Sequence, residues 1–199
     1  MTCFDTFKES AKHEFNICVD SLEERDFLPS VQMIQEAEYA GNRLHVTGIG
    51  KPSHVATYVA SLISSTGTPC YFLHGTEAVH GSCGQLVPGD VVICISNSGE
   101  TAEMKATAIA IRNNGCKLIA VTGNPDSWLA KFADQHLLAR VNNEGGPLNR
   151  APRNSIEAEM LVLQALSVIL QEKKALTPQQ YVLHHPGGAL GQLRADEKE

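Results

Sequence analysis

The stretch Asp90-Val-Val-Ile-Cys-Ile-Ser-Asn-Ser-Gly-Glu-Thr101 decides the fold of this chain. Val91 to Ile95 is an unbroken apolar run without a polar face, which is typical of a central parallel strand covered on both sides. Helical sequence follows from Thr101 to Asn114. We therefore predict a strand, a short polar turn and a helix, the repeating unit of an α/β sheet.

The turn after this strand predicts a phosphate site. It carries hydroxyl groups, a glycine and free backbone N–H groups at the start of a helix, on the residues Ser96, Asn97, Ser98, Gly99 and Thr101. The helix dipole favours negative charge there, and a glycine has no Cβ to block the approach of a ligand. A single hydroxyl would be explained as a helix cap, but this combination favours phosphate binding.

Strands and helices alternate along the rest of the chain. Residues 1–41 predict two amphipathic helices, with Pro29 in the first turn of the second. We expect strands at 43–47, 70–73, 91–95, 117–122 and 136–141, an irregular segment at 74–84 and a loop at 142–153. Helices are expected from the end of the turn 48–53 to about residue 65, and at 101–114, 127–132 and 156–170. This order predicts a doubly wound, five-stranded parallel sheet of the Rossmann-like α/β class, with its ligand crevice at the carboxyl ends of the strands.

Composition narrows the functional classes. The 199 residues suffice for one domain, and the net charge of −6 with few aromatic residues argues against nucleic acid as a partner. No apolar run is long enough to span a membrane, and the N-terminus lacks the pattern of a signal peptide, so we expect a cytoplasmic protein. The six cysteines show no zinc-finger spacing, and Cys70 and Cys94 lie in apolar runs, as reduced core residues do.

Further polar groups are expected around the crevice. Gly48-Ile-Gly50-Lys51 follows a predicted strand, and its spacing matches neither a dinucleotide fingerprint nor a P-loop. At a glycine-lined strand end that faces a phosphate loop, Lys51 is expected to stabilise charge on a substrate. Ser53 lies on the same rim.

A second group of polar residues lies in the segment from His74 to Gly81. It holds Glu77 and the imidazoles of His74 and His80, and loops of this kind often carry function. Acid–base or structural use is favoured over a metal site, because the ligand spacing is loose and a fourth donor is missing. We therefore predict no metal. Glu103, at the start of the helix after the phosphate loop, and Glu144 complete the carboxylates.

These motifs together resemble a known family. Gly48–Lys51, Glu77–Gly81 and Ser96–Thr101 resemble the sugar isomerase (SIS) domain. The segments Glu144-Gly-Gly-Pro-Leu148 and His185-Pro-Gly-Gly-Ala-Leu-Gly191 narrow the resemblance to the D-arabinose 5-phosphate isomerases. It spans Arg43 to Leu193, so we expect residues 1–42 to be N-terminal helices of the same domain, 43–193 the SIS domain and 194–199 a charged tail.

The resemblance implies interconversion of D-ribulose 5-phosphate and D-arabinose 5-phosphate, the first step toward the lipopolysaccharide sugar Kdo. It places the catalytic residues at Lys51, His80, Glu103, Glu144 and His185, with further substrate contacts expected at Gly48, Gly50, Ser53, His74, Glu77 and Ser155. It also implies a homotetramer with sites near the subunit boundaries. Moving a carbonyl between neighbouring carbons through an enediol needs a base and an electrophile, so no cofactor is expected.

The roles within this set stay open in part. Glu103 or Glu144 would carry the proton, Lys51 would stabilise the oxyanion, and His80 or His185 would move hydroxyl protons. The alternatives are a sugar-phosphate-binding regulator without catalysis and an isomerase of another sugar phosphate.

Three departures from the family pattern bear on these alternatives. Typical members continue into a pair of CBS domains, whereas this sequence ends at residue 199, so regulation through such a pair is not expected. Arg153-Asn154-Ser155-Ile156 replaces a stretch rich in Thr and Ser. Ser82-Cys83 replaces Asp-Leu after the His80-Gly81 pair.

Overall fold

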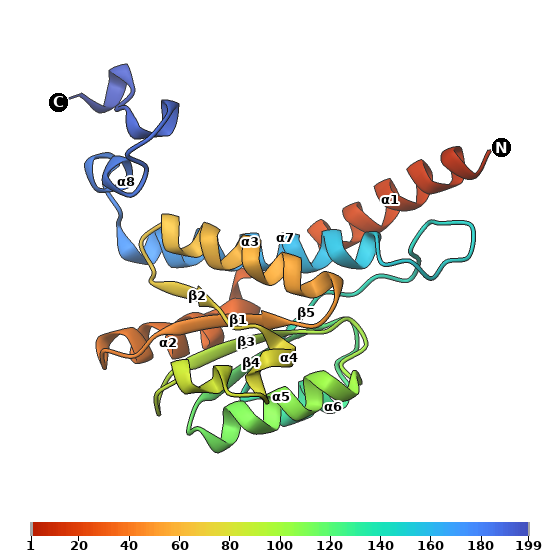
Figure 1. Ribbon diagram of the computed structural model, residues 1–199. Coiled ribbons are helices and arrows are strands. Elements are labelled where there is room, and N and C mark those ends of the chain that lie inside the picture. Colours follow the sequence, from red (N-terminus) through yellow and green to blue (C-terminus); the bar gives the residue numbers. More distant parts are fainter. Residues whose placement is uncertain (1, 199) are drawn as a thin grey trace.

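A computed structural model describes residues 2–198 and shows one parallel five-stranded sheet (Figure 1). The strand order is β2-β1-β3-β4-β5. The strands are β1 (Leu44–Gly48), β2 (Cys70–Phe72), β3 (Val91–Ile95), β4 (Lys117–Thr122) and β5 (Gln135–Leu138). The predicted doubly wound sheet of five strands is confirmed.

The central strand β3 has the boundaries that its apolar run predicts. All five of its residues are buried, and Val91 pairs with Leu44 of β1 and with Lys117 of β4. From β1 the chain first moves outward to β2 and then crosses to β3 on the other side of β1. The connections that leave β1 and β3 therefore diverge, and their ends flank the crevice where such sheets bind ligands.

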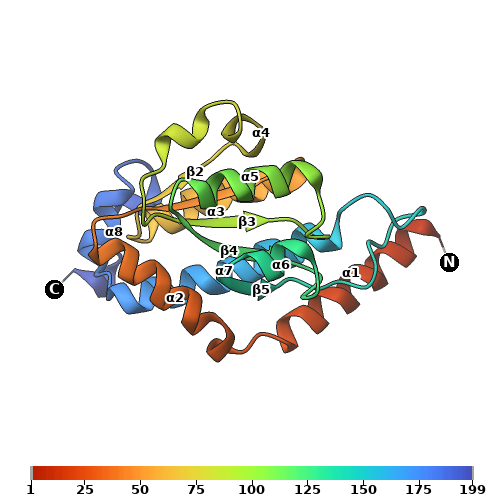
Figure 2. The same ribbon diagram turned by 90° about the horizontal axis from the view of Figure 1, so that it is seen from below.

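Helices cover both faces of the sheet (Figures 1 and 2). One face packs on α2 (Glu24–Tyr39), α3 (Lys51–Ser65) and α7 (Asn154–Lys174), and the other on α4 (Gly75–Ala78), α5 (Ala102–Asn113) and α6 (Trp128–Phe132). Two separate buried clusters result, one around Ile93 and Leu163 and the other around Cys94 and Leu118. Alternate residues of β3 thus face opposite cores, as expected for a strand covered on both sides.

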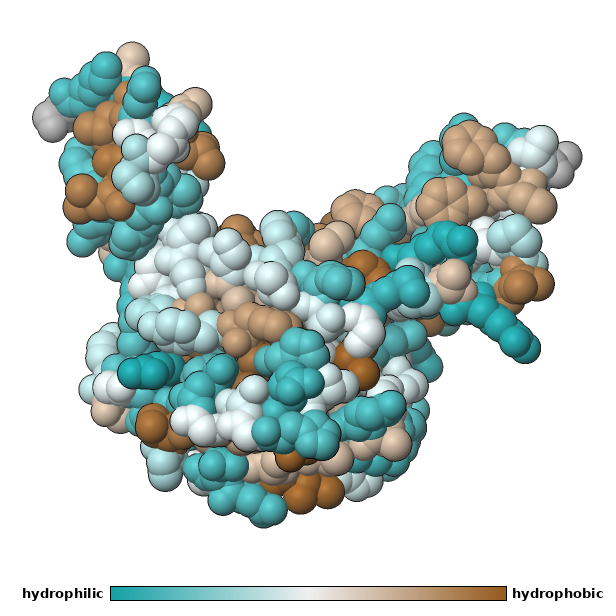
Figure 3. Space-filling view, in the orientation of Figure 1, coloured by the Kyte–Doolittle hydropathy of each residue, from teal (hydrophilic) through white to brown (hydrophobic). Residues whose placement is uncertain are grey.

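Two helical arms extend from this body at opposite ends (Figures 1 and 3). α1 (Cys3–Asp20) packs on α7 through only part of its length, and Phe4 is 67% exposed. The other arm holds α8 (Pro178–His184) and two 3₁₀ turns, Ala189–Gly191 and Ala195–Glu197, with Leu183 76% exposed. Both arms carry apolar side chains that one chain does not cover. Within residues 2–198, no helix has the length and apolar character needed to cross a membrane.

Several predicted boundaries and elements differ from those in the structure. α2 begins at Glu24, so Pro29 lies inside the helix rather than in its first turn. β5 ends at Leu138, before the predicted Val141. The segment 74–84, predicted to be irregular, contains α4 and a 3₁₀ turn, Ser82–Gln85. α8 was not predicted, although the Thr177 hydroxyl and the Gln180 side chain form a capping box at its start.

Candidate functional site

Two adjoining cavities lie at the carboxyl ends of β1 and β3. The first has a volume of about 240 Å³, and its walls include Ser96, Ser98 and Thr101 on one side and Ser155 and Glu159 of α7 on another. The second, of about 440 Å³, is lined by Gly48, Gly50, Lys51, Ser53, His54, His74 and Thr76. Ile49 borders both cavities, so they meet at the end of β1.

The loop after β3 offers donors to an anion. The Ser96 and Thr101 hydroxyl oxygens lie 3.3 Å apart, and the Gly99 N–H donates to the Ser96 carbonyl at 2.9 Å, which closes a tight turn. Thr101 stands at the N-cap of α5, yet its side chain accepts no hydrogen bond from the helix. The first N–H groups of α5 are therefore left without a side-chain cap, as at helix termini that bind phosphate.

The loop after β1 brings a second helix start to the same place. Gly50 is the N-cap of α3 and supplies no side chain, while the Ser53 hydroxyl donates to the Gly50 carbonyl at 2.6 Å. A Cβ at Gly48 would lie 2.6 Å from the carbonyl carbon and oxygen of Pro52. Glycine at position 48 thus lets the first turn of α3 close onto the end of β1, which places Lys51 at the cavity.

Glycine at position 99 is explained by the backbone turn and by packing, whereas the sequence suggested close approach of a ligand. Its φ of +65° lies in the left-handed region, and a Cβ there would collide with the Ser127 side chain. The backbone turn and the contact with α6 require this glycine. Access for a ligand is not needed to explain it.

Glu144 holds the 142–153 loop against the start of α7. Its carboxylate accepts hydrogen bonds from the backbone N–H groups of Arg153, at 2.6 Å, and Ser155, at 3.2 Å. Ser155 is itself part of the wall of the first cavity. These two bonds fix the Glu144 carboxylate beside that wall.

Glu159 is a polar residue that the sequence analysis missed. Its side chain is fully buried in the wall of the first cavity, and neither carboxyl oxygen has a hydrogen-bond partner among the described residues. Burial, and then the nearby charge of Glu144, raise the pKa of Glu159 to about 8. The available signal was a glutamate placed within an almost wholly apolar helical run.

Of the other predicted residues on this edge, His74 lines the second cavity, whereas Glu77, His80 and Glu103 lie outside both cavity walls. The His74 ring accepts the Glu77 N–H at 3.3 Å and so caps α4. Glu77, His80 and Glu103 are exposed, and Glu103 stands in the first turn of α5. Glu100 accepts the Trp128 N–H at 2.7 Å and pairs with Lys105 at 2.5 Å, so it serves to dock α6.

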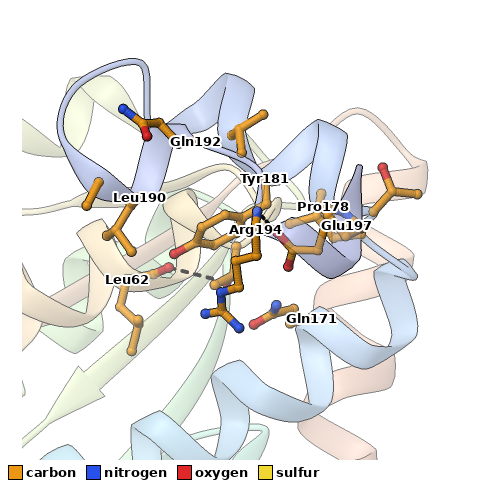
Figure 4. A pocket seen from close by; sticks show the side chains of 13 residues that line it. Leu62, Gln171, Pro178, Tyr181, Leu190, Gln192, Arg194 and Glu197 are labelled. Atoms are coloured by element: carbon orange, nitrogen blue, oxygen red, sulfur yellow. Dashed lines mark hydrogen bonds between the residues drawn. The ribbon is translucent and has the colours of Figure 1, made fainter. Parts of the chain in front are cut away.

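The structure of one chain does not bring His185 to the cavities. His185 stacks on Tyr181 with a centroid distance of 4.1 Å, and its neighbour His184 contacts the carbonyl of Ser65 at 3.2 Å. Ser65 ends α3 and Lys51 begins it. The 15 residues of α3 place these two ends about 21 Å apart. A third cavity, of about 470 Å³, lies beside the C-terminal arm (Figure 4).

Neither a metal cluster nor a disulfide is found among the described residues. Across residues 2–198, no three His, Cys, Asp or Glu side chains are grouped so as to hold a metal ion. All six cysteines are unpaired. Burial raises the pKa of the Cys94 thiol to about 12 and raises that of Cys83 as well, so both stay protonated near neutral pH.

The SIS domain family matches residues 39–169 of this chain. The chain is a member of the SIS domain family. Over 176 residues it is 41% identical to arabinose 5-phosphate isomerase KdsD of Pseudomonas aeruginosa, and this match covers 87% of the chain and 53% of that protein. It is 43% identical over 146 residues to KdsD of Escherichia coli K12, a match that covers 73% of the chain and 44% of that protein. This SIS chain thus spans about half the length of these relatives.

A solved structure extends the likeness over a whole chain. The structure of E. coli CFT073 c3406 in complex with arabinose 5-phosphate superposes with a TM-score of 0.85 at 34% identity. The superposition covers 92% of this SIS chain and 95% of that chain. The two chains therefore share one architecture over most of their length.

Proposed function

We propose that this SIS domain is an aldose–ketose isomerase that interconverts D-ribulose 5-phosphate and D-arabinose 5-phosphate, and so supplies Kdo synthesis in the cytoplasm. The observation that carries the proposal is the loop after β3, whose hydroxyls and uncapped helix start border a cavity next to Lys51 and Glu144. The name of the KdsD relatives and the arabinose 5-phosphate complex of c3406 support the same substrate. Six unpaired thiols suit a reducing compartment.

In the proposed reaction, the phosphate binds the Ser96, Ser98 and Thr101 hydroxyls and the first N–H groups of α5. The carbon chain then extends along the cavity toward the end of β1. A carboxylate, Glu144 or Glu103, removes the proton from the carbon next to the carbonyl and returns it to the former carbonyl carbon. Lys51 would stabilise the negative charge on oxygen in the enediolate.

We further propose that the working form is a homotetramer in which His185 reaches the cavities of a neighbouring copy. His185 lies on a projecting arm, at the far end of α3 from Lys51. Leu183 on this arm is 76% exposed and Phe4 on the other arm is 67% exposed, which fits surfaces that a second copy covers. His80, exposed at the same edge as the cavities, would also face this boundary.

The test is ketopentose formation from arabinose 5-phosphate by the purified protein, with EDTA present. We expect turnover in the wild type, and we expect Glu144→Gln and Glu103→Gln to show which carboxylate is the base through a loss of about 100-fold or more. Binding of arabinose 5-phosphate is followed separately as a thermal shift. Binding without turnover would instead indicate a regulator, and turnover of another sugar phosphate only would indicate a different isomerase. If arabinose 5-phosphate neither binds nor reacts, the proposal fails.

A further inference from the structure

Glu159 occupies a position in which burial of a carboxyl group is energetically unfavourable. It lies in the second turn of α7 with its side chain fully buried, and neither of its oxygens has a hydrogen-bond partner among the described residues. Four residues earlier, the buried Ser155 hydroxyl also lacks a partner there. Buried polar groups are nearly always hydrogen-bonded, so these two groups in the wall of one cavity indicate a partner that the free chain does not supply.

These two groups face the proposed phosphate loop across the first cavity. Residues four apart on a helix lie on the same face, so the Ser155 and Glu159 side chains are neighbours. Both belong to the wall of the cavity that Ser96, Ser98 and Thr101 border from the other side. A sugar phosphate held at this loop would place its carbon chain, just beyond the phosphate, against this pair.

The charge state of Glu159 suits a neutral partner. Burial and the nearby Glu144 raise its pKa to about 8, so the carboxyl is protonated near neutral pH. A protonated carboxyl can donate one hydrogen bond and accept another, which matches a hydroxyl group. A carboxylate would instead repel the phosphate about one carbon away.

We propose that Glu159, assisted by the Ser155 hydroxyl, hydrogen-bonds the sugar hydroxyl on the carbon next to the phosphate-bearing carbon. Glu159 is then a specificity-determining residue of the site, which selects sugar phosphates that carry a hydroxyl at this position. The inference rests on the proposed isomerase function and deepens it. The stretch 153–156, where this chain departs from the family pattern, forms the N-cap and the start of α7, and Glu159 follows in the second turn.

The test compares two substrates in three variants. The substrates are arabinose 5-phosphate and its 4-deoxy analogue, which lacks the hydroxyl in question. Because the same oxygen closes the furanose ring, the analogue stays open-chain, and KM is therefore compared between variants for one substrate at a time. The variants are Glu159→Ala, Glu159→Gln, which keeps the shape and part of the hydrogen bonding, and the control Glu157→Gln on the same helix but outside the cavity wall. Steady-state KM and kcat are measured for the wild type and each variant with each substrate, and circular dichroism checks the fold of each protein.

For arabinose 5-phosphate, we expect Glu159→Ala to raise KM about tenfold or more with kcat changed by less than about threefold, Glu159→Gln to lie between, and Glu157→Gln to match the wild type. For the 4-deoxy analogue, wild type and Glu159→Ala should have the same KM within about twofold, because the bond is absent in both. A KM increase of equal size for both substrates, or no effect of either Glu159 variant, would overturn the inference. If Glu159→Ala does not fold, the comparison is decided by Glu159→Gln.

The same measurements separate this inference from the proposed function. If the wild type converts arabinose 5-phosphate and the Glu159 variants behave as the control does, only the role of Glu159 is wrong. If the wild type neither binds nor converts arabinose 5-phosphate, the isomerase proposal fails, and the role of Glu159 fails with it.

Discussion

At the scale of single residues, Gly48 offers a direct test of how the site is built. Gly48→Ala would place a Cβ 2.6 Å from the Pro52 backbone and force the first turn of α3 away from β1. We expect a loss of about 1–3 kcal/mol in the free energy of unfolding and reduced turnover, because Lys51 moves with that turn. Urea unfolding measures the first effect. Gly84→Ala is the control, since nothing lies within 4 Å of a Cβ there; equal losses in both would contradict this explanation.

Glu159 also predicts a pH dependence of stability. Its pKa rises from 4.5 to about 8 on folding, so the folded chain holds a proton that the unfolded chain releases between these values. The contribution of Glu159 to the free energy of unfolding therefore falls as pH rises from about 4.5 to about 8, and stays low above that. Urea unfolding at pH 5, 7 and 9 should show a smaller decline in Glu159→Gln than in the wild type. Parallel pH profiles would show that Glu159 is not buried as described.

Individual residues also show where sequence reasoning ends. The hydroxyl groups of the loop after β3 and Lys51 line adjoining cavities, as expected from the sequence, because strand ends in a parallel sheet meet at one edge. Glu159 was missed because its significance lies in burial without a partner, which depends on packing between distant segments. Gly99 was noticed for a ligand, although the Ser127 side chain and a positive φ explain it.

At the scale of elements, Asp90 joins the amino ends of β1 and β3. Its carboxylate accepts the Arg43 N–H at 2.9 Å and the Val87 N–H at 3.0 Å, and lies 3.1 Å from His45 Nε2. Burial alone would raise the pKa of Asp90, but these hydrogen bonds, one from Asn42 and the nearby His45 together lower it. The carboxylate is therefore charged and fully hydrogen-bonded where the two strands start.

Asp90→Ala should accordingly be strongly destabilising. It leaves two backbone N–H groups and the buried His45 ring without their acceptor, for which we expect a loss of about 3–5 kcal/mol. Chemical denaturation measures the loss. Asp126→Ala is the control, because Asp126 is exposed and pairs only with Lys131 at the surface, and it should change stability by less than about 0.5 kcal/mol. A similarly small effect at Asp90 would contradict its role as a strand clamp.

The elements themselves were predictable where one local signal dominates. β3 and β4 have their predicted boundaries, because continuous apolar runs between turns specify buried strands. α8 was missed since it has no buried residue, and only its capping box marks it. The predicted start of α2 is wrong because proline usually lies in the first turn of a helix, whereas α2 accommodates Pro29 in its interior.

At the scale of the whole molecule, the sequence predicts that His185 belongs to the same site as Lys51, but it does not predict which copy of the chain supplies it. His185 lies 134 positions from Lys51 in the sequence. The two residues can meet either within one folded chain or between two assembled chains. The structure of one chain puts His185 at the opposite end of α3. Both projecting arms expose apolar side chains, which agrees with the proposed assembly (Figure 3).

Mixing two inactive variants tests this assembly directly. Lys51→Ala and His185→Ala should each lose most turnover of arabinose 5-phosphate when purified alone. If every site combines Lys51 of one copy with His185 of another, co-refolded equal mixtures should regain about one quarter of wild-type turnover, because only sites that draw an intact residue from each variant can work. Light scattering should show that the mixture and the wild type have the same tetrameric mass. Separate folding followed by mixing without subunit exchange is the control and should stay inactive. No recovery in co-refolded tetramers would mean that each chain builds its site alone, which the position of His185 on the far arm argues against.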